Sequence, residues 1–193
     1  MKITMQGMDF NRIMRVCVPA LSNDNTRKPL MYIKIESNGK GEGCATALDG
    51  FVLAQTRFLC EGDAGECLLF PLKPVDEHSV VEISSDNELT SVQTEDCTIT
   101  RKVPPVGGYI IHSKVTQEAQ KNDKVITVAL NPVHLARILK SHKRRNEPVF
   151  LDIYADTKPI VVSTDESMGL LLPMRFSFNR ETPGFWAVNA DGD

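Results

Sequence analysis

Two segments of this chain carry the same pattern of apolar and basic side chains, and this repetition restricts what the chain can fold into. With an offset of 125 residues, three apolar positions coincide: Phe10 with Leu135, Ile13 with Ile138, and Met14 with Leu139. Two basic positions coincide as well: Arg12 with Arg137, and Arg15 with Lys140. Apolar residues at steps of three and four share one face of a helix. The agreement of apolar and basic positions together favours one supersecondary unit used twice.

Segments with strand character flank both predicted helices. Residues 2–5 precede the first helix and residues 127–130 precede the second. A segment in which apolar residues alternate with polar or aromatic ones follows each helix, at residues 31–36 and 149–154. Later apolar runs at residues 51–54 and 170–172 also hold comparable places. We therefore expect a duplicated β-α-β-β unit.

The ends of the helices have their own signals. Asp9 is favourable at the start of the first helix, and Pro19 strains or ends it near its last turn. Asn131 followed by Pro132 is typical of a helix N-cap and first helical position. Leu135, Ile138, Leu139 and His142 form the predicted inner stripe of the second helix.

Most of the remaining chain has strand character. Short apolar runs separated by Gly, Pro, Asn and Asp occur at residues 51–53, 68–70, 80–83, 98–100, 126–128 and 160–162. The expected class is α+β, with much antiparallel sheet and few amphipathic helices. We expect one domain over residues 1–110, a second over 111–176 and a tail over 177–193. The alternative is a single domain with an insertion at residues 60–122.

Composition excludes several classes of protein. No stretch of the 193 residues approaches the length of an apolar membrane span, and the N-terminus lacks the apolar core of a signal sequence. The five cysteines form no C-x-x-C pair, so we expect reduced, partly buried thiols, no metal site and a cytoplasmic protein. The net charge of −3 excludes a chain that is basic throughout, but not a local cationic surface.

Such a surface is predicted on the outer faces of the two helices. Arg12 and Arg15 lie opposite the first apolar stripe. The second helix and the residues after it carry five cations and no carboxylate between residues 131 and 146: Arg137, Lys140, Lys143, Arg144 and Arg145. Surface helices often carry some Lys and Arg, but the repetition at matching positions favours binding of phosphates without sequence preference.

Several motifs, in order, resemble those of the bacterial DNA polymerase III β sliding clamp. They are Ala47-Leu48-Asp49-Gly50-Phe51-Val52-Leu53-Ala54, Leu68-Leu69-Phe70-Pro71-Leu72-Lys73, Pro105-Val106-Gly107-Gly108-Tyr109, the helix from Asn131 to Lys140, Lys158-Pro159-Ile160-Val161-Val162, and Leu170-Leu171-Leu172-Pro173-Met174-Arg175. Together they extend over most of residues 1–176.

The resemblance implies a ring with helices on its inner wall and sheets outside, which encircles duplex DNA without sequence preference. It also implies a hydrophobic pocket for short linear motifs of polymerases and other replication proteins. The family's pocket positions fall on Gly50, Phe51, Val52, Leu53, Leu172, Pro173, Met174 and Arg175. Leu and Met side chains there suit an apolar peptide anchor.

The chain also departs from the family. Leu48, Phe51 and Val52 replace Thr, His and Arg, which makes the pocket more apolar. A family subunit has three domains with two helices each, whereas this chain has about half that length. After Lys73 the family has another helix, but residues 74–79 are too few and lead into a strand. A closed ring therefore needs several copies, at least three, and the tail could cover the pocket or a sheet edge.

The sequence favours a binding protein without a cofactor over an enzyme. It contains no nucleophile elbow, phosphate-binding loop, dinucleotide fingerprint or H-E-x-x-H. The glycine-rich residues 39–43 join two predicted strands, so we expect a hairpin there. Two other functions stay open: a clamp-derived adaptor or decoy that does not encircle DNA, and an unrelated α+β fold with a deep ligand cavity.

Overall fold

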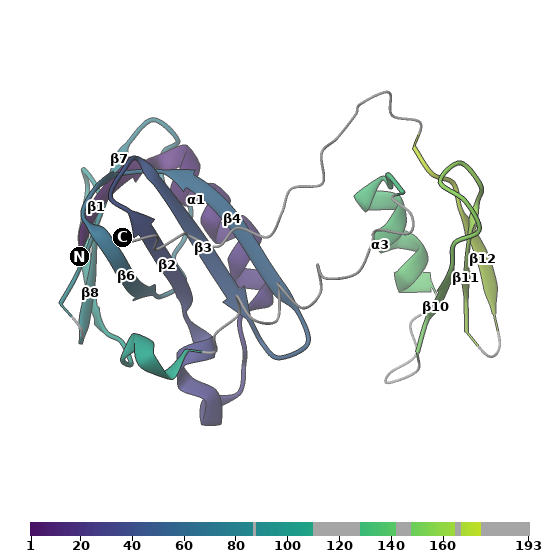
Figure 1. The fold of residues 1–193 in the computed structure, drawn as a ribbon, viewed down its shortest axis with the longest axis horizontal. Helices are drawn as coiled ribbons and strands as arrows, with labels where there is room; N and C mark the ends of the chain where they lie inside the picture. The colour runs from purple at the N-terminus through teal and green to yellow at the C-terminus, as the bar shows by residue number, and fades with distance from the viewer. Residues whose placement is uncertain (87, 110–127, 142–147, 165–166, 175–193) are drawn as a thin grey trace, which may run out of the picture. The chain divides into compact units, whose positions relative to one another are not determined.

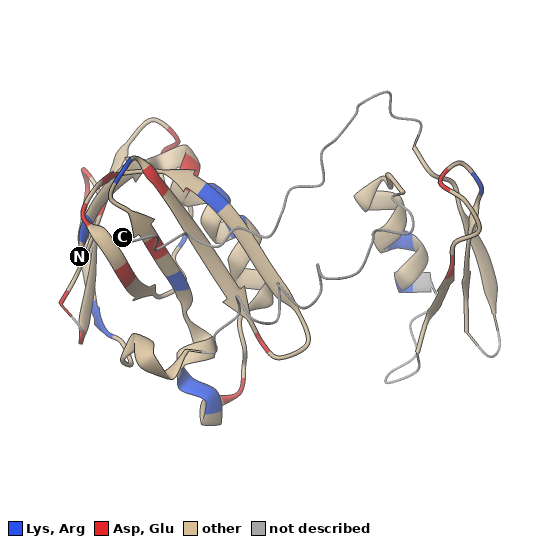
Figure 2. Cartoon of the chain, in the orientation of Figure 1, with Lys and Arg blue, Asp and Glu red and all other residues tan. Residues whose placement is uncertain are grey.

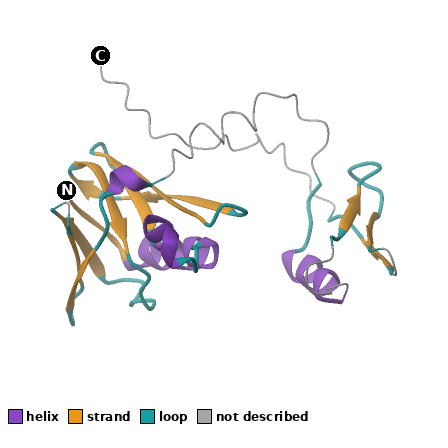
Figure 3. Ribbon diagram, turned by 90° about the horizontal axis from the view of Figure 1, so that it is seen from below, coloured by secondary structure: helices purple, strands orange, loops and turns teal. Residues whose placement is uncertain are grey.

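The computed structural model describes residues 1–86, 88–109, 128–141, 148–164 and 167–174. The chain forms two compact units, one of Met1–Glu118 with Gly184–Asp193 and one of Ala119–Pro183 (Figure 1). The boundary expected after residue 110 lies outside the described residues. In these residues helices are few and every strand pairing is antiparallel, so the expected α+β class is confirmed (Figure 3).

In its described residues, the first unit consists of two antiparallel sheets and one α-helix. One sheet has the strand order β5-β1-β7-β8-β9 and the other the order β4-β3-β2-β6. The strands are β1 (Lys2–Gln6), β2 (Ile33–Asn38), β3 (Glu42–Leu48), β4 (Leu53–Leu59), β5 (Glu61–Gly62), β6 (Ala64–Leu69), β7 (Val80–Ser85), β8 (Leu89–Gln93) and β9 (Thr98–Lys102). The helical segments are α1 (Gly7–Cys17) and the 3₁₀ turns η1 (Val18–Ala20), η2 (Asn25–Met31) and η3 (Val106–Gly108).

The two sheets exchange strands. β1 is the first strand of the chain, yet it pairs with β7, with Ile3 opposite Ile83. Conversely, β6 pairs with β2, with Ile35 opposite Cys67. The first half of the unit, β1 to β4 with α1, thus contributes β1 to the sheet of β7, β8 and β9. The second half, β6 to β9, contributes β6 to the sheet of β2, β3 and β4. This exchange joins the two halves into one body.

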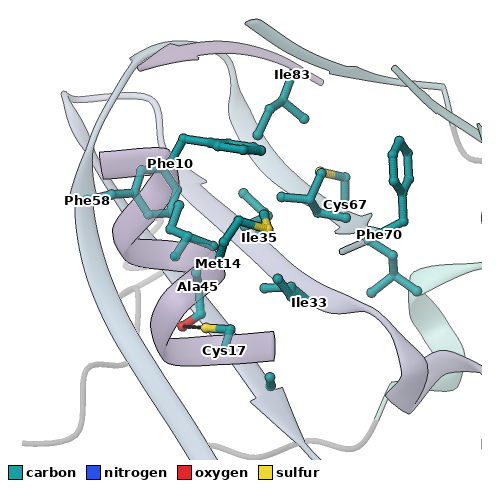
Figure 4. Packing of buried hydrophobic residues seen from close by; sticks show 14 of the residues in the cluster. Phe10, Met14, Cys17, Ile33, Ile35, Ala45, Phe58, Cys67, Phe70 and Ile83 are labelled. Atoms are coloured by element: carbon teal, nitrogen blue, oxygen red, sulfur yellow. Dashed lines mark hydrogen bonds between the residues drawn. The ribbon is translucent and has the colours of Figure 1, made fainter. Parts of the chain in front are cut away.

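The core of the first unit lies between α1 and the strands. Figure 4 shows Phe10, Met14 and Cys17 of α1 among side chains from both sheets. Phe10, Ile13 and Cys17 are fully buried, as the apolar stripe predicts. The Cys17 thiol also donates to the Ala45 carbonyl at 3.7 Å. Complete burial of a side chain as large as Phe10 or Ile13 stabilises a fold by about 1.5–3 kcal/mol.

Local sequence explains where α1 ends. The helix stops at Cys17, and Pro19 lies in the 3₁₀ turn η1 that follows, which confirms the expected stop. A buried Tyr109 closes the other end of the unit after η3, since its hydroxyl donates to the Thr46 carbonyl at 3.0 Å. Burial raises the pKa of Tyr109 above its ordinary value, and the Cys17 thiol adds to this shift.

The segment after β6 lies along α1 without forming a helix. The Gly7 amide donates to the Ser79 carbonyl at 2.8 Å and the Met8 amide donates to the Glu77 carbonyl at 2.9 Å, so the segment carbonyls satisfy amides of the first helical turn. A Cβ on Gly7 would lie 1.9 Å from the Asp76 carbonyl oxygen. Only glycine therefore allows this approach. The structure assigns no helix to residues 74–79, which confirms the departure from the resembled family.

The expected hairpin at residues 39–43 is also present. Gly39 and Gly41 have φ angles of 66° and 100° between β2 and β3, in the region that glycine adopts without strain. The Asn38 side chain accepts from the Lys40 and Glu42 amides at 2.7 and 3.1 Å. These bonds make a tight Asx-type turn.

The described part of the second unit contains one helix and one small sheet. The elements are α3 (Pro132–Ser141), β10 (Phe150–Asp152), β11 (Ile160–Ser163) and β12 (Met168–Leu171), and the sheet order is β10-β11-β12. The Asn131 side chain accepts from the Val133 amide at 2.9 Å, so the predicted N-cap is confirmed. Leu135, Ile138 and Leu139 pack on the sheet as expected, whereas His142 lies outside the described residues.

Three strand predictions were wrong in part. Phe51 and Val52 lie in a turn, and β4 begins only at Leu53, because Asp49 holds the turn with its side chain. Residues 128–130 are not assigned to a strand, and residues 126 and 127 lie outside the described part. In β10 the expected alternation of burial is missing, since Phe150, Leu151 and Asp152 are all exposed.

The thiols agree with the expectation for unpaired cysteines. All five are free; Cys17, Cys44, Cys60 and Cys67 are buried, and Cys97 is exposed. In the described part of the chain no helix is long and apolar enough to cross a membrane.

Candidate functional surfaces

The outer face of α1 presents one exposed cation and one that is committed to an ion pair. Arg15 is exposed on the side opposite the apolar stripe. The Arg12 guanidinium forms an ion pair with the buried Asp9 carboxylate and donates to the Arg57 carbonyl at 2.8 Å. Because Asp9 offsets the charge of Arg12, Arg15 is the stronger candidate for contacting an anion.

The outer face of α3 presents two cations from the predicted set. Arg137 and Lys140 are exposed, and helical spacing puts them on the side away from Leu135, Ile138 and Leu139. Figure 2 shows basic positions in blue on α3. The other three predicted cations, Lys143, Arg144 and Arg145, lie outside the described residues. The described part of α3 contains no carboxylate, so its positive charge is not balanced on the helix itself.

The turn between β3 and β4 holds an aromatic side chain in solvent. The Asp49 side chain accepts from the Phe51 and Val52 amides, both at 2.8 Å, and Gly50 has a φ of 101°. These two amide donors, with that of Val52 the stronger, lower the pKa of the Asp49 carboxyl. The Phe51 side chain is 96% exposed and Val52 is exposed beside it. A turn fixed in this way presents apolar groups at low entropic cost, which suits partner binding.

Residues 172–174, after β12, are the second predicted pocket segment. Leu172 and Met174 are exposed. The Met174 amide donates to the Ala129 carbonyl at 2.8 Å, which fixes the backbone of the segment against the stretch before α3. Arg175 lies outside the described residues.

The predicted pocket residues thus form two groups. Residues 50–52 lie in the turn of the first unit with Leu53 at the start of β4, and residues 172–174 lie together in the second unit. Each group exposes apolar side chains on a backbone that hydrogen bonds hold in place.

A hollow in the first unit was not predicted. It has a volume of about 530 Å³ and lies between η2 and the end of β9, with Lys28, Tyr32, Glu88 and Lys102 in its lining. Lys102 and Glu88 form an ion pair across 3.1 Å. The lining residues lie far apart in the sequence, so no short motif predicts this hollow. The hollow is open and charged, unlike the deep cavity that an unrelated ligand-binding fold requires.

The buried thiols are poor nucleophiles. Burial raises the pKa of Cys17 and Cys67 to about 12 and that of Cys44 to about 11. A thiol becomes reactive as the thiolate, so these three stay inert near neutral pH. Within the described residues, no three His, Cys, Asp or Glu side chains are grouped so that they could hold a metal ion.

Structural comparison identifies the fold. The β chain of DNA polymerase III from Streptococcus pneumoniae matches with a TM-score of 0.67 and 18% identity, over 89% of this chain and 49% of that one. The β sliding clamp of C. crescentus matches with a TM-score of 0.69 and 16% identity, over 89% of this chain and 50% of that one. For the β subunit from Thermotoga maritima the TM-score is 0.53 at 14% identity, over 91% of this chain and 66% of that one.

The chain therefore has the fold of bacterial sliding clamps, which confirms the structural part of the resemblance. It spans about half the length of the first and second of these clamps. No protein-family model matches the sequence. No curated protein matches it.

Proposed function

We propose that this chain is a sliding-clamp-like processivity factor that contacts duplex DNA through the outer faces of its repeated helices. The observation that supports this most is the occurrence, in a clamp fold, of exposed cations at matching positions of α1 and α3: Arg15 and Lys140. Charges of this kind attract the phosphate backbone without reading its sequence. The function is binding and needs no cofactor.

Salt titration of duplex binding tests the DNA contact. Each neutralised phosphate contributes about −0.9 to the slope of log affinity against log salt. The variant Arg137→Glu/Lys140→Glu is expected to reduce that slope by about 2 and to weaken binding at least about tenfold. Lys40→Glu/Lys158→Glu changes the net charge equally at exposed sites outside the helices and serves as the control. An unchanged slope in the first variant would remove α3 from the interface.

Encircling is a separate part of the proposal. Because the chain spans about half of a clamp subunit, several copies must close a ring. A closed ring stays on nicked circular DNA and leaves the same DNA after linearisation. Equal retention on both templates would mean that the protein binds DNA without encircling it, and would exclude a clamp.

The apolar segments at residues 50–53 and at residues 172–174 are each proposed to bind short linear motifs of a DNA polymerase or other replication proteins. Leu172 and Met174 supply adaptable apolar contacts, and Pro173 restricts the backbone between them. Fluorescence anisotropy with a labelled peptide that carries a leucine and an aromatic anchor measures this binding. Unchanged affinity in Met174→Ala would count against the second segment.

A second candidate is an adaptor or decoy that binds replication proteins without encircling DNA. The exposure of Phe51 favours it, because the turn that holds Phe51 forms within the first unit and needs no ring. Peptide binding without retention on circular DNA is the expected result for the adaptor. The free, mostly buried thiols are consistent with the cytoplasmic location that either candidate requires.

A further inference from the structure

The hollow in the first unit combines an apolar and a charged part in its lining. The apolar part includes Tyr32, Pro104 and Pro105, and the charged part consists of Lys28, Glu88 and Lys102. Its volume of about 530 Å³ lies in the range that accepts a small ligand or an aromatic anchor with its neighbours. No lining residue belongs to the two segments proposed for replication motifs, so the hollow is a separate surface.

Hydrogen bonds hold the walls of the hollow in place. On one side, the Asp24 side chain caps the start of η2, the turn that carries Lys28. On the other side, the Val103 amide donates to the Glu88 carbonyl at 2.8 Å, and two prolines with restricted backbones follow. A surface whose shape is set before binding loses little entropy when a segment settles on it.

The charged part of the lining is positive on balance. Lys102 forms an ion pair with Glu88 at 3.1 Å, so these two charges offset each other. Lys28 is exposed and forms no ion pair with any described residue. Because the whole chain has a net charge of −3, this cation beside an apolar surface is a local exception. The hollow therefore suits a segment that combines aromatic side chains with carboxylates and lacks cations.

The tail of the chain contains a segment of this chemistry, at residues 184–193. Phe185 and Trp186 precede Asp191 and Asp193 there, and the segment has no Lys or Arg. Its ten residues belong to the same compact unit as the hollow, although the second unit separates them in the sequence. From Trp186 to Asp193 an extended chain reaches at most about 25 Å, so both kinds of group can meet one hollow.

We propose that residues 184–193 dock in this hollow, with the aromatic pair against Tyr32 and the two prolines and a carboxylate at Lys28. The aromatic side chains supply most of the apolar contact area. The ion pair adds a modest, salt-sensitive contribution, because Lys28 is exposed. The contact lies within one chain, so its effective concentration depends on the intervening residues and not on the concentration of the protein.

The fluorescence of Trp186 tests the docking directly, because it is the single tryptophan of the chain. In the native full chain, acrylamide is expected to quench it less than it quenches a free peptide of residues 184–193, and its emission maximum should lie at shorter wavelength. Dilution over a roughly hundredfold range should change neither property. Quenching equal to that of the peptide would show a tail open to solvent. Protection lost on dilution would show binding to another copy, and either result would overturn the proposal.

Charge reversal identifies the hollow as the docking site. Lys28→Glu/Lys102→Glu is expected to remove the protection of Trp186, because both positions then repel the two aspartates of the tail. Lys40→Glu/Lys73→Glu makes the same change at exposed positions of the first unit outside the lining, and it should keep the protection. Protection that persists in the first variant, or that is lost equally in both, would exclude the hollow.

A compensating reversal separates loss of docking from loss of folding. Asp191→Lys/Asp193→Lys alone should also expose Trp186. Combined with Lys28→Glu/Lys102→Glu it restores opposite charges, and the protection should return, which a misfolded hollow does not allow. Exposure of the tryptophan in the combined variant would contradict the pairing. None of these measurements involves DNA or a replication motif, so failure of the proposed function leaves this inference standing.

Discussion

Asn11 and Val75 bind each other through two hydrogen bonds. The Asn11 side-chain amide donates to the Val75 carbonyl at 2.8 Å, and its carbonyl accepts from the Val75 amide at 2.9 Å. One side chain on α1 thus satisfies both backbone groups of a residue in the segment that replaces a helix. This pair, with the bonds to Gly7 and Met8, explains how the segment stays ordered without secondary structure.

Removing the Asn11 side chain should therefore destabilise the first unit. Asn11→Ala leaves two partly buried backbone groups without their partner, at an expected cost of about 1–3 kcal/mol. Urea unfolding followed by circular dichroism measures the change in the free energy of unfolding. Asn25→Ala, at an exposed position, is the control and is expected to change it by less than about 0.5 kcal/mol. Equal stability of the two variants would mean that water replaces the Asn11 contacts.

The close approach at Gly7 leads to a second prediction. A methyl group there meets the Asp76 carbonyl oxygen at 1.9 Å, so α1 and the segment must separate. Gly7→Ala is expected to destabilise the protein by about 1–3 kcal/mol despite the higher helix propensity of alanine. Gly107→Ala adds the same group where no atom lies within 4 Å, and it should leave the melting temperature nearly unchanged. A Gly7→Ala protein as stable as the Gly107→Ala protein would contradict the observed approach.

The local parts of the fold could be predicted from the sequence. Asn131 caps α3, Pro19 follows the end of α1 and glycines turn the hairpin after β2, because each feature depends on a residue and its near neighbours. The apolar stripes of both helices were identified for the same reason. The repeat also indicated which surfaces would carry cations.

Features that depend on distant contacts could not be predicted in this way. Nothing near Asn11 in the sequence points to Val75, and Gly7 appears unremarkable until Asp76 lies against it. The alternation around Leu151 predicted a half-buried strand, but Leu151 is not among the residues that pack with α3 on Val162, and it stays 47% exposed. Of the candidate site, the residue types were predictable, whereas the contact of Arg12 with the distant Arg57 carbonyl was not.

The buried thiols make the stability of the protein sensitive to alkali. In the unfolded chain a thiol loses its proton near pH 9.0, whereas Cys17 and Cys67 keep theirs to about 12 when folded. The unfolded state therefore binds fewer protons above pH 9, and the free energy of unfolding should fall as the pH rises from 9 toward 12. Cys17→Ala should weaken this dependence, and Cys97→Ser, at the exposed thiol, should not change it.

Thiol labelling checks the same burial without unfolding. In the native protein at pH 8, a colorimetric disulfide reagent is expected to label Cys97 quickly and the four buried thiols slowly. All five should react at once in denaturant. Fast labelling of more than one thiol in the native state would contradict the burial of the others.

The Phe51 turn gives a prediction that separates binding from folding. Since the Phe51 side chain is 96% exposed, Phe51→Ala should change the free energy of unfolding by less than about 0.5 kcal/mol. If the turn binds the apolar anchor of a peptide, the same variant should weaken peptide binding at least about tenfold, a loss of about 1.4 kcal/mol. Asp49→Ala removes the acceptor for two turn amides and should weaken binding by freeing the turn, whereas Asp49→Asn keeps an oxygen acceptor and should bind nearly as well as the wild type. Peptide affinity that is unchanged in both Phe51→Ala and Asp49→Ala would exclude this turn from the partner site, because neither the anchor contact nor its positioning would then contribute.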